Sequence, residues 1–139
     1  MKALSIRQPW AWLICFGGKD IENRCWSTRF RGEFLLHAAK GMTRAEYQDC
    51  ADFANLPPFE KLERGGIVGI ARLADCVSGH RSEWFNGPFG FVLAEVRPLR
   101  FVPCRGELGF FEVPADITAS CLGFLCRPVS VAYARGEGA

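Results

Sequence analysis

A short segment near the N-terminus combines the cationic, acidic and aromatic side chains from which a binding or catalytic site can be built. It holds Lys19, Glu22, Arg24 and Trp26, directly after the pair Gly17-Gly18. In an extended strand, side chains alternate between two faces, so Glu22, Arg24 and Trp26 share one face and Lys19 lies at its start. Lysine and arginine suit phosphate, a carboxylate accepts from an exocyclic amine, and a tryptophan stacks on a base. The segment therefore predicts a nucleotide site.

Residues around this segment extend the candidate site. Trp10 is a second candidate for base stacking, although core burial is the commoner role of a tryptophan in an apolar segment. Gln8 either contacts the ligand or caps a helix. Arg7, Arg29 and Arg31 form a basic rim that contacts backbone phosphates or is only solvated.

A purely structural interpretation of the same residues stays open. Glu22 and Arg24 would then form a salt bridge on a strand, and Trp26 would belong to the core. His37 is likewise either a hydrogen-bonded wall residue or a group that moves a proton.

Glu95 is a further candidate acid. It interrupts the apolar run Phe89 to Val96, on the face expected for Phe91 and Leu93. An unpaired carboxylate is costly there, so Lys19 or an arginine is its expected partner.

Length and composition indicate one intracellular domain. The 139 residues, 49% of them apolar, suffice for a single core, expected over residues 1–135 with a frayed tail at 136–139. No apolar run is long enough for a membrane span, and Arg7, Gln8 and Pro9 interrupt the place of a signal peptide. A cytoplasmic protein without a membrane association is expected.

The charge distribution and the cysteine and histidine content indicate which kinds of ligand the protein is expected to bind. Residues 1–44 carry eight Lys/Arg against three Asp/Glu, and the rest carries nine against twelve. Such asymmetry suits a local polyanion site, although an ordinary mixed surface explains it as well. The seven cysteines form no C-x-x-C pair and are expected to be reduced and buried. His37 and His80 are far apart, so neither a metal nor a cofactor is expected.

The pattern of elements predicts an α+β fold. Pro9 and Gly17-Gly18 bound a helix over Trp10–Phe16, and Thr43 with Glu46 caps a second helix that runs to about Ala54. Strands are expected at 20–26, 33–39, 67–74, 89–96, 101–103, 110–113 and 129–134. Many short strands with few helices indicate a small β-barrel of about five to seven strands, decorated by two or three helices.

The N-terminal part of the chain resembles the ASCH family of the PUA-like superfamily. The diagnostic pattern G-x-K-x-x-E-x-R falls on Gly17, Lys19, Glu22 and Arg24, after L-S-I-R-Q-P-W-A and before W-S-T. Similarity continues through Gly87-Pro88-Phe89 and the segment after Pro103, to about Pro114. The resemblance implies a PUA-like β-barrel with one cleft.

The resemblance also implies two classes of function. PUA-like barrels commonly recognise RNA or a modified nucleobase, which makes RNA or a nucleotide-like ligand the expected partner, with DNA possible. Some ASCH relatives are instead amidohydrolases on acylated cytidine, using a lysine, a threonine three residues later and a downstream glutamate. Lys19 and Glu95 match that set, whereas Glu22 replaces the threonine.

Two other functions stay open beside these. A ribonuclease is conceivable, with Lys19 stabilising charge on phosphate and His37 or Glu22 moving the proton. A protein-interaction module is the third class, since relatives occur attached to transcription coactivators.

Overall fold

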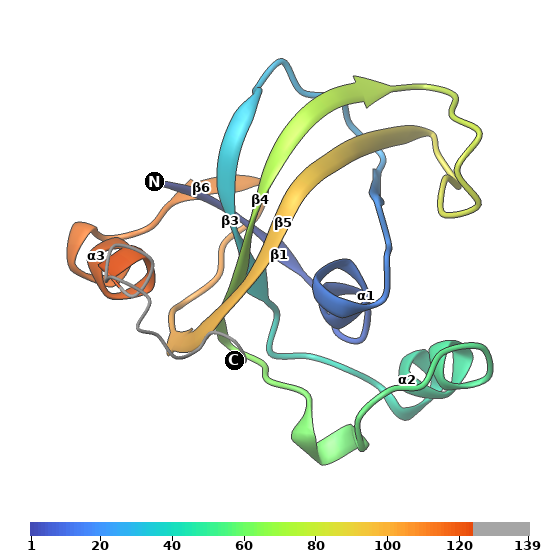
Figure 1. Cartoon of the computed structure of the whole chain (residues 1–139), viewed down its shortest axis with the longest axis horizontal. Coiled ribbons are helices and arrows are strands. Elements are labelled where there is room, and N and C mark those ends of the chain that lie inside the picture. Colours follow the sequence, from blue (N-terminus) through green and yellow to red (C-terminus); the bar gives the residue numbers. More distant parts are fainter. Residues whose placement is uncertain (124–139) are drawn as a thin grey trace.

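Six strands form one mixed sheet that curls into a half-barrel (Figure 1). The computed structural model describes residues 1–123, so the predicted strand over 129–134 and the predicted tail lie outside the described residues. Along the sheet the strand order is β2-β5-β4-β3-β1-β6. The strands are β1 (Lys2–Ile6), β2 (Ile21–Arg24), β3 (Gly32–Ala38), β4 (Gly66–Val77), β5 (Phe89–Pro103) and β6 (Phe110–Glu112).

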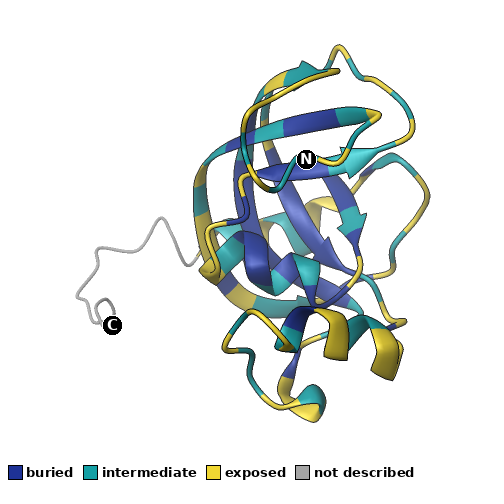
Figure 2. Ribbon diagram, turned by 90° about the vertical axis from the view of Figure 1, so that its right-hand side faces the viewer, coloured by how far each residue is buried: buried dark blue, intermediate teal, exposed yellow. Residues whose placement is uncertain are grey.

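Both faces of the sheet are covered, because side chains alternate along each strand. On β3, Phe34 and Leu36 point into the curl, while Leu35 faces the opposite side. On β1, Leu4 shares the first cluster and Ala3 the second. This explains why the centre of β3 is continuously apolar, and Figure 2 shows the buried residues concentrated along the strands.

Three helices flank the sheet: α1 (Trp10–Phe16), α2 (Arg44–Ala51) and α3 (Ala115–Gly123), with a 3₁₀ turn at Phe59–Lys61. The prediction of α1 is confirmed at both ends. In α2 the predicted capping box is present, since the Thr43 hydroxyl accepts from the Glu46 amide and the Glu46 carboxylate accepts from the Thr43 amide. The helix ends at Ala51, earlier than predicted.

The longest two strands differ from the prediction. Two separate strands were expected at 89–96 and 101–103, yet β5 is continuous from Phe89 to Pro103. Pro98 has no amide hydrogen to donate, and the register between β4 and β5 shifts between Ile67 and Gly69, opposite this proline. The strand therefore continues through Pro98 with irregular pairing to β4 instead of ending there.

The sequence pattern predicts neither β1 nor α3. β1 lies between β3, to which it is parallel, and the antiparallel β6. α3 follows Pro114 and places Ile117 and Cys121, four residues apart, against the outer cluster of the sheet. The predicted α+β architecture with a curled, barrel-like sheet is confirmed, with six strands and three α-helices in the described part of the chain.

Side chains, and not a hydrogen-bonded ladder, join the two edges of the sheet. The edge strands β2 and β6 are not paired among residues 1–123. The ring of Trp26, just after β2, lies 6.0 Å from the ring of Phe110 on β6 and 5.2 Å from that of Phe91. These aromatic contacts close the half-barrel beside the end of β2.

The remaining sequence expectations concern cysteines and membrane segments. All six cysteines within residues 1–123 are free thiols. Three are buried and two are intermediate, but Cys25 is exposed, which corrects the expectation that all are buried. No helix in this part of the chain has the length and hydropathy to cross a membrane.

Candidate functional site

A glycine turn between α1 and β2 delivers Lys19 to the interior. The amides of Gly17 and Lys19 both donate to the carbonyl oxygen of Leu13, at 2.8 and 3.1 Å. A Cβ atom at Gly17 would lie 2.7 Å from the Leu13 side chain, and Gly18 has a φ of +76°. Only glycines form so tight a turn without strain, and the turn aims the Lys19 side chain inward.

Lys19, Glu22 and Arg24 form one polar network. The Lys19 ammonium donates to the carbonyl oxygen of Ile21 and lies 3.5 Å from Glu22 Oε1. Arg24 Nε donates to Glu22 Oε2 at 3.0 Å, and Arg24 Nη2 donates to the carbonyl oxygen of Ser5 at 2.8 Å. Lys19 is only 4% exposed and Glu22 only 8%. Arg24 therefore links β2 to the end of β1 and anchors a buried ion pair.

Burial controls the charge of Lys19. Desolvation lowers the pKa of Lys19 below its ordinary value, while the neighbouring Glu22 acts in the opposite direction and only partly offsets it. The net direction is downward, because the ammonium is removed from water more completely than one carboxylate compensates.

The network lies in the wall of a cavity of about 1100 Å³. Four aromatic side chains line it, contributed by α1, the end of β2, the end of α2 and the β4–β5 connection: Trp10, Trp26, Phe53 and Trp84. The Phe53 and Trp84 rings are 5.9 Å apart, and Phe53 is 63% exposed. A polar centre and aromatic walls thus meet in one space, which we call the aromatic lobe.

Asn23 of β2 holds the β4–β5 connection in place. Its amide donates to the carbonyl oxygen of Trp84 at 3.0 Å, and its Oδ1 accepts from the amides of Asn86 and Gly87 at 2.8 and 3.1 Å. Ser82 Oγ also donates to Asp20 Oδ1 at 2.6 Å. The strand that carries Glu22 and Arg24 therefore also positions the Trp84 wall.

A second cavity of about 860 Å³ adjoins the first and shares Ser5, Arg7 and Arg24 with it. We call it the basic lobe. His37 lies in its wall, 2% exposed, with Nε2 2.7 Å from the Cys104 carbonyl oxygen and Nδ1 2.9 Å from Ser5 Oγ. Because a carbonyl only accepts, Nε2 carries the proton and Nδ1 accepts from the serine. Burial lowers the pKa of His37, so the ring is a neutral wall residue at pH 7.

A sequence profile of the ASCH domain matches residues 4–100. The chain belongs to the ASCH domain family. This family is generally linked to RNA binding. No curated protein matches the chain.

Solved structures share the fold of this ASCH domain. One is an ASCH protein from Zymomonas mobilis, 16% identical over 84% of this chain and 90% of that chain, with a TM-score of 0.49. Another is a mutant of the same Zymomonas mobilis protein, 17% identical over 89% of this chain and 94% of that chain, with a TM-score of 0.51. The second comparison supports the shared fold alone.

Most of the predicted central residues of the ASCH domain come together. Lys19, Glu22, Arg24 and Trp26 all line the aromatic lobe, as does Trp10. The structural interpretation of these residues holds at the same time, because Glu22 pairs with Arg24 and both tryptophans pack against the core. The two interpretations are compatible, since both rings are only partly buried, packing against the core and also lining the cavity.

Arg7 has two roles in the structure. It lines both lobes, yet its guanidinium donates two bonds of 2.7 Å to the Glu46 carboxylate. The Arg7 hydrogen bonds, together with the Thr43 amide, lower the pKa of Glu46 to about 2. Arg7 thus ties the start of α2 to the end of β1, and only part of its bonding capacity faces a ligand.

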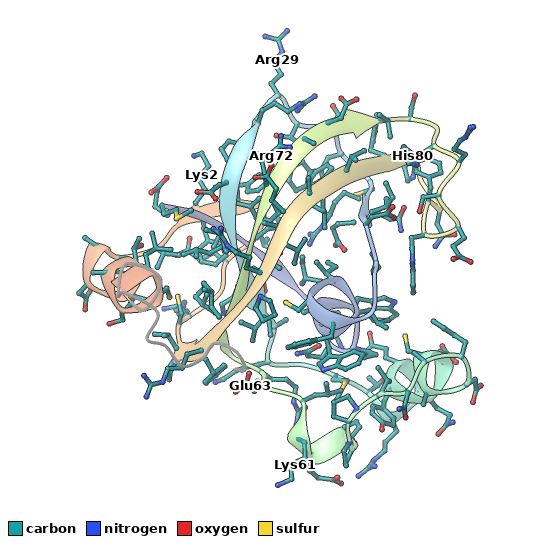
Figure 3. The ribbon with its side chains drawn as sticks, viewed as in Figure 1. Lys2, Arg29, Lys61, Glu63, Arg72 and His80 are labelled. Atoms are coloured by element: carbon teal, nitrogen blue, oxygen red, sulfur yellow. The ribbon has the colours of Figure 1, made fainter. Side chains whose placement is uncertain are left out.

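Gln8 and two of the three predicted rim arginines do not line either lobe. Gln8 is buried, its amide group donating to the Glu63 carbonyl oxygen at 2.8 Å and its Oε1 accepting from the Trp12 amide at 2.9 Å. Arg31 pairs with Asp75 on the outside of the sheet. Arg29 projects from the β2–β3 connection, away from both lobes (Figure 3). For Gln8 the helix-capping alternative is met, since Trp12 lies in the first turn of α1, and the basic rim is narrower than predicted.

Glu95 is the clearest error of the sequence interpretation. It has a φ of +50° and lies in a bulge, where Glu95 and Val96 of β5 face a single residue of β4. The bulge breaks the alternation and turns the carboxylate outward, where it is exposed and 3.2 Å from Arg72 Nε. The expectation of an arginine partner is met, but Glu95 is not beside Lys19.

Sequence reasoning missed the far wall of the aromatic lobe. Phe53 and Trp84 lie far along the chain from the ASCH motif, and the one signal that marks them is an aromatic residue in a polar, loop-like segment. No group of His, Cys, Asp and Glu among residues 1–123 is arranged to hold a metal ion. The arrangement is suited to a flat ligand with polar edges that is placed between rings and against the network.

Proposed function

We propose that this ASCH domain binds RNA by holding one unstacked base in the aromatic lobe, against Lys19, Glu22 and Arg24. The observation that supports it most is this buried series of cation, carboxylate and cation in the wall of a cavity with four aromatic side chains. Such a combination recognises both the polar edge and the flat face of a nucleobase.

The network retains capacity for a ligand. Each carboxylate oxygen of Glu22 bonds one cation of the network and keeps a further lone pair, so it can accept from an exocyclic amine. Arg24 uses Nε and one N–H of Nη2 within the protein, which leaves further donors of its planar guanidinium. The residues are held in place by each other, so little ordering is needed on binding.

The walls favour single strands. Stacking of a base on an aromatic side chain contributes about 1–3 kcal/mol. A base in a duplex is already stacked and paired, whereas a base in a single-stranded loop or end can enter a cavity without unpairing. The proposal therefore concerns single-stranded RNA, in keeping with the general association of the ASCH family with RNA.

Binding of short single-stranded RNA to matched variants tests the proposal. Lys19→Met and Arg24→Gln each remove one charge-assisted contact, so we expect each to weaken binding by about 10- to 100-fold. The exposed Arg29, away from the cleft, supplies the control, and Arg29→Gln should leave affinity unchanged at constant salt. Thermal unfolding would verify that each variant is folded. Equal affinities of the wild type and folded cleft variants would disprove the proposal.

A second candidate, hydrolysis in the same cleft, is favoured by one observation. The pKa of Lys19 is lowered by burial, as a lysine that accepts a proton requires. Against amidohydrolysis, Glu22 stands where the threonine is expected, and Glu95 is outside the cleft. Incubation with acylated cytidine and with RNA, analysed for product, separates the two functions, since binding alone leaves both substrates intact.

A further inference from the structure

The two lobes of the cleft differ in chemistry although they share a wall. The aromatic lobe balances its charges, with three cations (Arg7, Lys19, Arg24) and three acids (Glu22, Asp49, Glu83) beside its four aromatic side chains. The basic lobe has no Phe, Tyr or Trp in its wall and has four cations against one acid: Arg7, Arg24, Lys40, Arg105 and Glu107. A base suits the first lobe and an anion suits the second.

The two cations specific to the basic lobe have no acidic partner within residues 1–123. Arg7 and Arg24 are held by Glu46 and Glu22, whereas Lys40 and Arg105 form no ion pair in this part of the chain. Both lie at the surface, on segments that follow β3 and β5. A ligand anion would therefore not have to displace a carboxylate from either of them.

The shape of the basic lobe depends on glycines that bring these segments together. A Cβ atom at Gly65, where φ is +80°, would lie 3.2 Å from Lys40 Cγ, so the stem of Lys40 lies across this glycine. A Cβ atom at Gly106 would lie 2.6 Å from His37 Cε1, so the segment with Arg105 packs directly on the His37 ring. The lobe is a formed cavity with positioned cations and not a chance cluster of surface charge.

Arg24 lies where the lobes meet. It lines both, and its bonds to Glu22 and to the Ser5 carbonyl hold it between β2 and β1. In a nucleotide only the sugar lies between base and phosphate, and the two lobes likewise adjoin, since they share Ser5, Arg7 and Arg24. The site suited to a base, Arg24 and the site suited to an anion therefore follow one another along one cleft.

We infer that the ligand carries a phosphate group next to the recognised base, with the base in the aromatic lobe and the phosphate in the basic lobe, held by Lys40 and Arg105. This inference rests on the proposed function and adds a phosphate subsite to it, so that a nucleotide or an oligonucleotide should bind more tightly than a free nucleoside. Guanidinium and ammonium groups are the usual donors to phosphate, and both Lys40 and Arg105 line this lobe.

Affinities for the four ribonucleosides, their 3′- and 5′-monophosphates and short single-stranded RNA test the inference. We expect a phosphate to raise affinity by about tenfold or more over the matching nucleoside. The double variant Lys40→Ala/Arg105→Ala should remove this gain and leave nucleoside binding unchanged. For RNA, its plot of log affinity against log salt should become shallower by about 0.7 for each phosphate that the variant no longer neutralises.

A matched control removes the same charges elsewhere. Arg29→Ala/Lys61→Ala also deletes one arginine and one lysine, both exposed and outside both lobes, and should preserve the gain from phosphate. A gain confined to monophosphates would identify a free nucleotide, and a gain that appears only with RNA would identify a chain; both support the inference.

Two results would overturn the inference but leave the proposed function standing. Equal affinity for nucleosides and their phosphates, or an equal loss from the control double variant, contradicts the phosphate subsite but leaves base binding intact. Failure of every nucleoside, nucleotide and RNA to bind contradicts the proposed function, and the inference with it.

Discussion

At the scale of single residues, Lys19 shows how the site combines burial with charge. A lysine that is 4% exposed is unfavourable for stability unless its ammonium is satisfied, and here it contacts the Ile21 carbonyl and the Glu22 carboxylate. Such an arrangement holds the cation in one position. As a consequence, Lys19 loses its positive charge at a lower pH than a surface lysine does.

Ligand affinity should therefore fall on the alkaline side. The pKa of Lys19 is lowered by burial, so its positive charge is lost as pH rises through a range in which an exposed lysine stays protonated. Because the proposed ligand contact uses the ammonium form, we expect RNA affinity to decrease as pH rises toward the ordinary lysine value of about 10.4. Fluorescence anisotropy with an oligonucleotide of A and C, whose bases do not ionise in this range, measures the change.

The variant Lys19→Arg is the control for this pH dependence. Arginine does not deprotonate in proteins at these pH values, so its affinity, even if lower, should stay constant over the same range. An identical alkaline decrease in Lys19→Arg would show that another group causes it, and the assigned role of Lys19 would be wrong.

At the scale of elements, the edge strand β2 organises the whole aromatic lobe. Glu22 and Arg24 line the lobe, and Asn23 between them makes three hydrogen bonds to the β4–β5 connection. Alternate residues of one short strand thus line the lobe and position its wall. Bonds to Trp84 and Asn86 fix an aromatic wall that no local propensity of its own segment would hold.

Loss of the Asn23 side chain should free this wall. In Asn23→Ala the amides of Asn86 and Gly87 lose their acceptor, so we expect their hydrogen exchange to accelerate by about tenfold, the equivalent of one net hydrogen bond. RNA affinity should fall as Trp84 loses its fixed position. Amide exchange resolved by NMR, together with the binding assay, measures both effects.

The variant Asn23→Asp distinguishes the acceptor role of the Asn23 side chain from its donor role. It keeps an acceptor for both amides and loses only the bond to the Trp84 carbonyl, so Asn86 and Gly87 should stay protected from exchange. If exchange in Asn23→Ala equals that in the wild type, the connection is held by other contacts and Asn23 does not position the wall.

At the scale of the whole molecule, the site residues that lie close together in the sequence were predictable, and those that lie far apart in the sequence were not. Glu22 and Arg24 were predictable because they alternate along one short strand, and Lys19 because it follows the glycine pair directly before that strand. The segments with Phe53, Trp84, Lys40 and Arg105 reach the cleft only through the curl of the sheet, so their meeting is a property of the tertiary fold. The local sequence pattern does not indicate that these segments meet.

The wrong predictions have equally physical causes. The face of Glu95 was inferred from strict alternation, which one inserted residue in a bulge reverses. For Gln8 one of the two alternatives, ligand contact, is not met, whereas helix capping is, because its Oε1 accepts from the Trp12 amide in the first turn of α1. The continuity of β5 was missed because a proline such as Pro98 usually ends a strand, while an irregular register accommodates it here.

His37 joins three parts of the molecule and should make its stability depend on pH. The ring, on β3, contacts Ser5 of β1 and the Cys104 carbonyl after β5, and packs 5.7 Å from the Phe111 ring of β6. Burial lowers the pKa of His37, so the unfolded chain takes up a proton at a pH where the folded protein does not. The His37 contribution to stability is therefore complete above about pH 6.5 and decreases as pH falls below it.

The variants His37→Gln and His80→Gln isolate this contribution. His37→Gln retains a donor for the Cys104 carbonyl, and we expect it to lower the free energy of unfolding by about 1 kcal/mol at pH 7. Between pH 7 and pH 5 its stability should then fall less steeply than that of the wild type, because no buried imidazole resists protonation. His80 is exposed in the β4–β5 connection, so His80→Gln should keep the wild-type slope. Urea unfolding at several pH values measures the slopes, and equal slopes for the wild type and His37→Gln would show that the pH dependence of stability arises elsewhere.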